Sequence, residues 1–257
     1  MRDRLKRLIR QSKPAPPRPP ERKKLLFQHM PDVLYAIGDV HGHLELLLKL
    51  EQLIAADAKK EPGEKALILL GDYVDRGPAS ADVIAHVMKP SRHGLRTFQL
   101  AGNHEEIMLD FLKSPSPDHA WLRFGGVETL RSYGIDELPP AREDLHALLR
   151  AKIPEAHVRF LESLPSLIAF PDLCFTHGGT DPNVDLKDQL DEVLLWKRPD
   201  ADPVPLPYLL VHGHTPVKRA EITPARVNVD TGAYATGILS AVKIKKSGEI
   251  FIVSCSR

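Results

Sequence analysis

Two kinds of segment alternate through the first half of the chain. Short, largely apolar runs that end at or just before a glycine predict buried strands. The segments between these runs place apolar residues at helical spacing. Strand followed by helix, three times over, favours parallel strands joined by right-handed crossovers in a sheet covered on both faces. The predicted strands are 33–37, 66–70 and 96–100, and the predicted helices are 44–56, 79–89 and 105–112.

The second half begins with a helical region and continues with strands. Residues 115–165 lack strand signals, and we interpret Trp121 as a packing residue, with a substrate-facing lid as the alternative. Four prolines predict a loop over 199–207. We therefore expect one α/β domain over residues 32–257 with a helical insertion. Its remaining predicted strands are 167–170, 173–176, 208–212, 226–229, 238–244 and 249–253.

Charge is distributed unevenly along the chain. The whole sequence is nearly neutral, with 35 Lys and Arg against 34 Asp and Glu, but residues 1–31 hold ten basic residues, two acidic residues and a cluster of five prolines. Because proline removes backbone donors, this arm is expected to be extended and unpacked. We favour a solvated, disordered tail, and the net charge of +8 makes contact with nucleic acid, anionic lipid or an acidic partner the alternative.

Composition narrows the class of protein. Hydrophobic residues make up 42% of the 257 residues, and no run approaches the roughly 18 apolar residues that a membrane span needs. The first ten residues lack the unbroken apolar stretch of a secretory signal. Two cysteines, Cys174 and Cys255, are too few for a disulfide scaffold, so we expect a reducing, cytoplasmic location.

Polar residues follow the predicted strands where the strands end. In open α/β sheets, ligands bind beyond the carboxyl ends of the strands, so these Asp, Asn and His side chains are expected to meet. Carboxylate, amide and imidazole groups without cysteine suit a hard or borderline divalent metal. About six such ligands are enough for two ions that share a carboxylate, an arrangement that favours in-line displacement at phosphorus. The segments are GDVHG at 38–42, GDYVDRG at 71–77, GNHE at 102–105, HGG at 177–179 and HGHT at 212–215.

These five segments, in this order, resemble the signature of the metal-dependent phosphoprotein phosphatases of the calcineurin-like metallophosphoesterase superfamily. WLRFGGVETLRSYG at 121–134 and VDTGAYA at 229–235 are similar to the bacterial and phage branch, to which the phage lambda phosphatase belongs. The resemblance covers about 33–253 and implies an α/β sandwich of two mixed β-sheets flanked by helices. It also implies two divalent metal ions, with Mn²⁺ expected first and Fe²⁺, Zn²⁺ or Mg²⁺ as alternatives.

The resemblance assigns the metal ligands residue by residue. Either His212 or His214 could serve from the residues alone, and the match of Gly-His-Thr favours His214. Asp230 follows a predicted strand, and a turn-forming role is favoured over a place in the wall of the site. In the implied set, Asp39 and His41 hold the first metal, Asp72 bridges both, and Asn103, His177 and His214 complete the second site.

Four further residues carry the implied chemistry. His104 matches the general acid of the family and is paired with Asp75, because a leaving alkoxide is costly unless it is protonated. A carboxylate partner raises the pKa of an imidazole and keeps a proton available. Arg76 and Arg198 match phosphate-binding arginines, whose guanidinium fork fits two phosphate oxygens. The alternatives are an Asp75–Arg76 pair and a surface position for Arg198.

The leading functional hypothesis is hydrolysis of phosphate monoesters, with phosphoserine and phosphothreonine of protein partners as substrates. A hydroxide that bridges the two metals would attack phosphorus directly. A dinucleoside-polyphosphate hydrolase of the diadenosine tetraphosphate type is the alternative, since it shares the metal motifs. The Asp75-Arg76 pair and Glu105 favour the protein-phosphatase pattern. A non-catalytic binding protein is the third hypothesis, and it predicts a damaged metal set that this sequence does not have.

Overall fold

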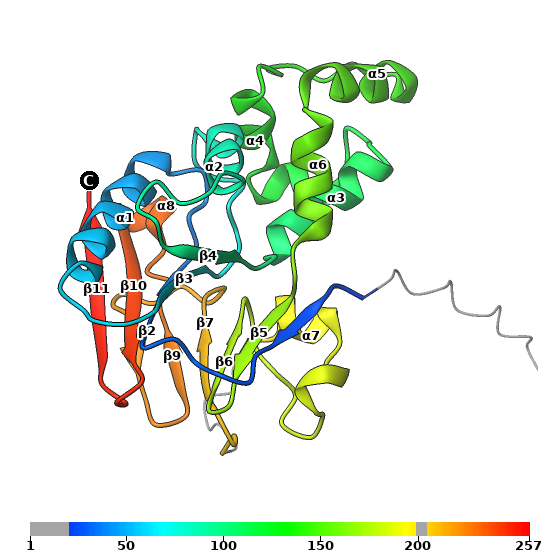
Figure 1. The fold of residues 1–257 in the computed structure, drawn as a ribbon. Helices are drawn as coiled ribbons and strands as arrows, with labels where there is room; N and C mark the ends of the chain where they lie inside the picture. The colour runs from blue at the N-terminus through cyan, green and yellow to red at the C-terminus, as the bar shows by residue number, and fades with distance from the viewer. Residues whose placement is uncertain (1–20, 199–204) are drawn as a thin grey trace, which may run out of the picture.

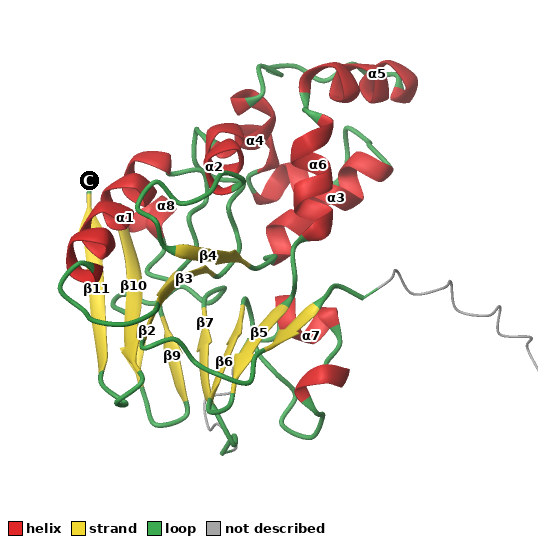
Figure 2. Cartoon of the chain, in the orientation of Figure 1, coloured by secondary structure: helices red, strands yellow, loops and turns green. Residues whose placement is uncertain are grey.

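Two β-sheets pack face to face at the centre of the molecule, and helices flank them (Figures 1 and 2). The structure is a computed structural model and describes residues 21–198 and 205–257. Both sheets mix parallel and antiparallel strands, so the expected α/β sandwich of two mixed sheets is confirmed.

The first sheet has five strands in the order β11-β10-β2-β3-β4. Its β2, β3 and β4 are parallel, as the repeated strand-helix pattern predicted, and β10 runs antiparallel to both β2 and β11. The strands are β2 (Val33–Ile37), β3 (Lys65–Leu69), β4 (Arg96–Gln99), β10 (Ile238–Lys245) and β11 (Ile250–Ser256).

The second sheet has six strands in the order β1-β5-β6-β7-β9-β8. Its central strands β6, β7 and β9 are parallel, so the chain leaves each of them at the same edge of the sheet. The strands are β1 (Lys24–Leu26), β5 (Leu167–Phe170), β6 (Leu173–Thr176), β7 (Leu209–His212), β8 (Glu221–Ile222) and β9 (Arg226–Asn228).

The helices lie outside the two sheets, and those of the insertion gather on one side of the molecule (Figure 1). The expectation of helix over 115–165 is confirmed. The helices are α1 (Leu44–Ala58), α2 (Ser80–Val87), α3 (Asn103–Lys113), α4 (Gly126–Ser132), α5 (Arg142–Lys152), α6 (Glu155–Ser163), α7 (Asp191–Trp196) and α8 (Ala233–Thr236), with short 3₁₀ helices η2 (Ala120–Phe124) and η3 (Leu186–Asp188).

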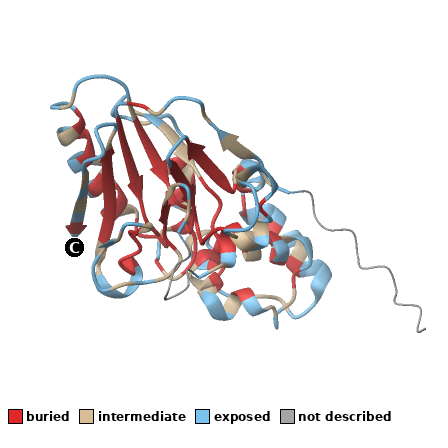
Figure 3. Cartoon of the chain, turned by 90° about the horizontal axis from the view of Figure 1, so that it is seen from below, coloured by how far each residue is buried: buried red, intermediate tan, exposed pale blue. Residues whose placement is uncertain are grey.

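Strand β2 explains how an unbroken apolar run fits a two-sided sheet. Leu34 and Ala36 belong to the core between the sheets, whereas Tyr35 and Ile37 belong to the core under the helices. All five residues of β2 are buried, because side chains of a strand alternate between its faces and both faces are covered (Figure 3). The covered sheets leave only the strand ends and their loops for a site.

The amino-terminal region differs from the sequence expectation. Lys24–Leu26, expected within the unpacked arm over 1–31, forms β1 and pairs with β5 in parallel. Arg22 helps to hold it, since its guanidinium donates to the carbonyl oxygens of Leu161 and Leu164. The rest of the arm expectation, residues 1–20, and most of the loop expected over 199–207 lie outside the described residues. In the described part, no helix combines the length and hydropathy needed to cross a membrane.

Candidate metal centre

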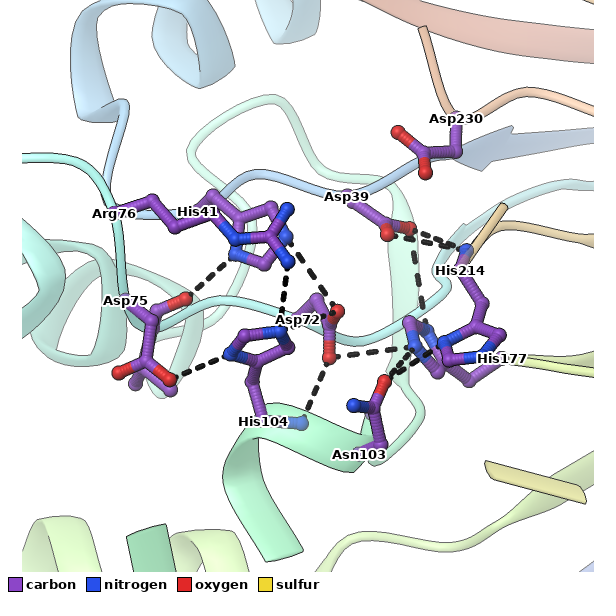
Figure 4. A network of polar contacts seen from close by, with 12 residues as sticks. Asp39, His41, Asp72, Asp75, Arg76, Asn103, His104, His177, His214 and Asp230 are labelled. Atoms are coloured by element: carbon purple, nitrogen blue, oxygen red, sulfur yellow. Dashed lines mark hydrogen bonds and ion pairs between the residues drawn. The ribbon is translucent and has the colours of Figure 1, made fainter. Parts of the chain in front are cut away.

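The polar residues that follow the strands meet at one edge of the two sheets (Figure 4). Asp39 follows β2, Asp72 follows β3, and Asn103 begins α3 after β4. His177 follows β6, and His214 follows β7 of the other sheet. Each sheet therefore supplies ligand candidates because parallel strands end at the same edge.

Asp72 lies at the middle of the cluster. One of its carboxylate oxygens, Oδ2, is 3.5 Å from Nε2 of His41, and the other, Oδ1, is 3.3 Å from Nε2 of His177. Two groups of ligand atoms, each within 4.8 Å of one another, share this residue. One group is His41, Asp72 and His104, and the other is Asp39, Asp72 and His177. A carboxylate between two groups of ligand atoms is what a bridging role requires.

Asn103 joins the two later histidines to the cluster. Its side-chain oxygen lies 2.9 Å from Nε2 of His177 and 2.8 Å from Nδ1 of His214. His177 uses its other nitrogen, Nδ1, at 2.9 Å from the carbonyl oxygen of Leu70, which fixes the direction of the ring. The backbone N–H of His214 donates to both oxygens of Asp39, at 3.2 and 3.1 Å. All six ligands expected from the sequence are thus neighbours.

The chemistry of this cluster fits divalent cations. Asp39 and Asp72 are each 2% exposed, and Asp230 lies beside them with the same exposure. Burial raises the pKa of Asp39 well above its usual range, and the negative charge of Asp230 raises it further. Buried carboxylates that repel one another, surrounded by imidazole and amide donors, gain stability from a cation. Asp39, His41, Asp72, Asn103, His177 and His214 would hold the metal ions.

Backbone strain is concentrated in this site. Among the described residues other than glycine, five have a positive φ, and all five belong to the site. Such residues are strained and persist only where surrounding contacts hold them, which occurs most often at functional sites. They are His41, Asp72, Asp75, Arg76 and His214.

Glu105 orders the loop that carries Asp72. Its Oε2 accepts the backbone N–H groups of Asp72 and Gly102 at 2.8 Å, and its Oε1 accepts that of Tyr73 at 2.7 Å and that of Val74 at 3.2 Å. A buried carboxylate with four donors fixes both loops that it joins. In the sequence, Glu105 is recognisable only as part of the GNHE motif. This contact joins two loops that are 33 residues apart, so local patterning carries no sign of it.

His104, Asp75 and Arg76 form a second polar group beside the ligands (Figure 4). Nδ1 of His104 lies 2.6 Å from Oδ2 of Asp75, and Nε2 of His104 lies 3.2 Å from a guanidinium nitrogen of Arg76. Burial lowers the pKa of His104, but the carboxylates of Asp72 and Asp75 outweigh burial, and the pKa lies above its ordinary value. Asp75 therefore contacts His104, as expected.

Three other residues considered from the sequence lie at the border of the site. Arg198 is exposed just after α7. Burial lowers the pKa of His214, and the positive charge of Arg198 lowers it further. His212 is buried, with Nδ1 2.9 Å from the carbonyl oxygen of Gly213, and it belongs to neither group of ligand atoms. Asp230 accepts the backbone N–H of Gly232 at 2.9 Å, which is the expected turn-forming contact, and it also faces Asp39.

A pocket of about 640 Å³ opens beside Arg76. Tyr234 borders it, and the guanidinium of Arg76 lies over the ring of Tyr234, 4.2 Å from its centroid. Phe124, the last residue of η2, is 52% exposed and lines the same pocket. The complete lining is Arg76, Leu122, Arg123, Phe124, Gly125, Val127, Glu128, Arg131 and Tyr234. The pocket combines positive charge with two aromatic rings.

The family model described as calcineurin-like phosphoesterase matches residues 33–238, which include every ligand candidate. The chain belongs to this family. The family recognised from the five motifs is thereby confirmed. Calcineurin-like phosphoesterases bind a pair of metal ions, and the ligand groups that share Asp72 are consistent with that.

Relatives of the family differ in the substrates that their names state. A bis(5'-nucleosyl)-tetraphosphatase of Bacillus velezensis is 28% identical over 218 residues, covering 76% of this chain and 82% of that protein. A crystal structure assigned provisionally to a diadenosine tetraphosphatase matches with a TM-score of 0.63 and 21% identity, covering 91% of this chain and 98% of the other. A serine/threonine phosphatase structure from Saccharomyces cerevisiae matches with a TM-score of 0.54 and 16% identity, covering 93% and 84%. The two structures show the shared fold.

Proposed function

We propose that this protein, a metallophosphoesterase, hydrolyses phosphate monoesters, with phosphoserine and phosphothreonine of proteins as its substrates. The observation that carries the proposal is the buried contact of 2.6 Å between Asp75 and His104. Two bound divalent metal ions would supply an activated water at neutral pH. The remaining steps belong to side chains of this chain.

His104 would protonate the departing oxygen of the substrate. Because Nδ1 faces Asp75, the proton to be donated would be carried by Nε2. In the described structure Nε2 lies 3.2 Å from the guanidinium of Arg76, which can only donate, so Arg76 would turn from Nε2 toward the phosphate when that proton is present. Serine and threonine leave as alkoxides, which are poor leaving groups, so proton donation is worth about 10²–10⁴ in rate. A nucleoside polyphosphate is a much better leaving group and needs this proton less. A well-built proton donor therefore supports an alkyl phosphate as substrate.

Arg76 would orient the phosphate group. Its guanidinium lies next to Nε2 of His104 and over the ring of Tyr234, so it is held at the side from which the leaving group departs. A guanidinium there can donate two parallel hydrogen bonds to phosphate oxygens. Arg198, which is exposed and close enough to His214 to affect its charge, would approach the phosphate from solvent.

A second candidate function, hydrolysis of dinucleoside tetraphosphates, is favoured by the pocket beside Arg76. Phe124 and Tyr234 offer rings on which a nucleobase can stack, and Arg123 and Arg131 offer charge for additional phosphates. The name of the Bacillus velezensis relative agrees with this function.

A paired assay separates the two functions. Metal-loaded protein is given a phosphothreonine peptide and diadenosine tetraphosphate at matched concentrations, and kcat/KM is compared. A higher value for the peptide supports the first function, and a higher value for the dinucleotide replaces it with the second.

The Phe124→Ala variant adds an internal check to this assay. Under the second function it should raise KM for the dinucleotide, whereas Phe251→Ala, at an exposed phenylalanine of β11, serves as the matched control. If both variants resemble the wild type, the pocket holds no base.

A further inference from the structure

The helical insertion reaches the carboxylate of Asp75 with two side-chain donors. The indole Nε1–H of Trp121 donates to both oxygens, at 2.8 Å to Oδ2 and 3.1 Å to Oδ1, and the hydroxyl of Thr129 donates to Oδ1 at 2.7 Å. Together with His104, these donors surround a carboxylate that is completely buried. Trp121 and Thr129 are themselves completely buried.

Thr129 also accepts a hydrogen bond from the backbone of Asp75. The N–H of Asp75 donates to Oγ1 of Thr129 at 2.8 Å and to Oγ of Ser80 at 3.0 Å. Asp75 and Arg76 have φ values of 74° and 69°, so this peptide segment is strained and needs external contacts to keep its shape. Thr129 therefore binds both the main chain and the side chain of Asp75.

Gly125 and Gly126 allow the insertion to pack this closely against Asp75 and Arg76. A Cβ on Gly125 would lie 2.5 Å from the backbone nitrogen of Arg76, and a Cβ on Gly126 would lie 2.5 Å from the indole ring of Trp121. The carbonyl oxygen of Gly125 accepts the N–H of Arg76 at 3.2 Å. The segment Trp121–Thr129 thus packs its backbone and side chains directly against Asp75 and Arg76.

We propose that Trp121 and Thr129 are positioning residues of the proton-donating pair: they hold Asp75 so that the imidazole of His104 presents Nε2 to the leaving oxygen. This rests on the proposed function, because it presumes that His104 is the proton donor. In the described structure, the side-chain hydrogen bonds of Trp121 and Thr129 go to Asp75 and Ser80 and not to a ligand candidate, so both act on the site through Asp75. Trp121, which the sequence indicated as a packing residue, also donates a hydrogen bond to the carboxylate of Asp75.

The test uses the full-length, metal-loaded protein and two substrates that differ in leaving group. The variants are Trp121→Phe, which removes the indole donor, Thr129→Val, which removes the hydroxyl, and Thr129→Ser, which restores it. Ser132→Ala is the matched control, because Ser132 lies on the same helix and hydrogen-bonds to Ala81 and to the carbonyl of Thr129 without touching Asp75. Each is assayed with a phosphothreonine peptide and with p-nitrophenyl phosphate, whose leaving group needs little protonation.

Trp121→Phe and Thr129→Val are expected to lower kcat for the peptide about 10- to 100-fold, in the range seen when supporting contacts of a reactive group are lost. The loss with p-nitrophenyl phosphate should be much smaller, KM and bound metal should stay near wild type, and Thr129→Ser should recover most of the activity. Adding Thr129→Val to His104→Asn should cost nothing further, because both changes remove one function.

Three results distinguish a failure of the positioning role from a failure of the proton-donor role of His104. Equal losses on both substrates, or a full additional loss in the His104→Asn background, would overturn the positioning role and leave Thr129 and Trp121 as packing residues. If His104→Asn discriminates between the substrates but Thr129→Val does not, this inference alone fails. If His104→Asn itself lowers both substrates equally, the proton-donor role in the proposed function fails as well.

Discussion

Gly213 lies directly against the carboxylate of Asp39: a Cβ at Gly213 would be 2.1 Å from Oδ1. The two residues come from different sheets, since Asp39 follows β2 and Gly213 follows β7. The next residue, His214, donates its backbone N–H to the same carboxylate. The close approach of the two sheets at their carboxyl edge therefore depends on the absence of a side chain at position 213.

The Gly213→Ala variant should displace Asp39 and weaken metal binding. We expect bound metal per chain to fall below the wild-type value and turnover to fall with it, while circular dichroism stays unchanged. Gly94→Ala is a control for the added methyl group, because nothing lies within 4 Å of a Cβ at Gly94; its φ of 72° strains an alanine, so it should lower stability without changing metal content. Normal metal content in Gly213→Ala would show that the carboxylate of Asp39 can move without loss of a ligand.

Replacing Asp72 should have a larger effect on metal content than replacing any other ligand candidate. Asp72 is shared by both groups of ligand atoms, so Asp72→Ala is expected to lose both ions, and His41→Ala is expected to lose mainly one. His104→Asn should keep close to two ions while kcat falls by about 10²–10⁴. Metal analysis after gel filtration, beside the turnover rate, checks all three. Loss of an ion from His104→Asn would make His104 a ligand.

Metal affinity should fall as the pH is lowered. Burial lowers the pKa of His177, but the carboxylates of Asp72 and Asp39 outweigh it and raise the pKa to about 10. Below that pH the metal-free site holds a proton on this imidazole, and a cation must displace it, so affinity should rise about tenfold per pH unit for each proton released. Competition with a chelator from pH 6 to 8 measures the slope. A slope of zero would mean that His177 binds no metal.

A charged cluster outside the site predicts a pH-dependent contribution to stability. Lys243 is 6% exposed and lies 2.6 Å from both Asp57 and Glu61, and Tyr35 donates to Asp57 at 2.6 Å. Burial raises the pKa of Asp57, but hydrogen bonds from Lys243 and Tyr35 outweigh it and the net pKa is lowered. A carboxylate whose pKa is lower in the folded than in the unfolded protein stabilises the fold at any pH above its unfolded-state pKa. This stability is lost as the pH falls through the folded-state pKa.

The Lys243→Met variant should therefore have a lower free energy of unfolding than wild type at pH 7. The difference should shrink below about pH 4, where the carboxylates become protonated in the unfolded chain. Urea unfolding at several pH values measures it. Lys246→Met, at an exposed lysine of the adjacent turn, is the control and should change little. A difference that is independent of pH would mean that lost packing, rather than charge, dominates.

The ligand candidates could be predicted because each follows a strand in sequence and the parallel strands end together. Asp39, Asp72 and His177 are therefore neighbours for a topological reason. The supporting contacts could not be predicted in this way. Trp121 and Thr129 lie 46 and 54 positions from Asp75, and a single hydrogen bond between distant segments leaves no periodic pattern.

Strand β1 was missed for a different reason. It has only three residues, between basic and proline-rich segments, so neither length nor alternation distinguishes it. Its stability comes from partners that the sequence does not place nearby: Phe27, just after it, stacks on Phe170 with ring centroids 5.2 Å apart, and the backbone N–H of Arg22 donates to Asp191.

The pairing of β1 with β5 makes a strand of only three residues the edge of this sheet, and a short edge strand offers little backbone to a strand of another molecule. Lys24–Leu26 covers the backbone N–H and C=O groups along the outer side of β5, groups that otherwise form a template for a strand of another molecule. A variant that begins at residue 32 should therefore self-associate, as size-exclusion chromatography would detect, whereas one that begins at residue 21 should not. We therefore expect Lys24–Leu26 to limit self-association of the protein.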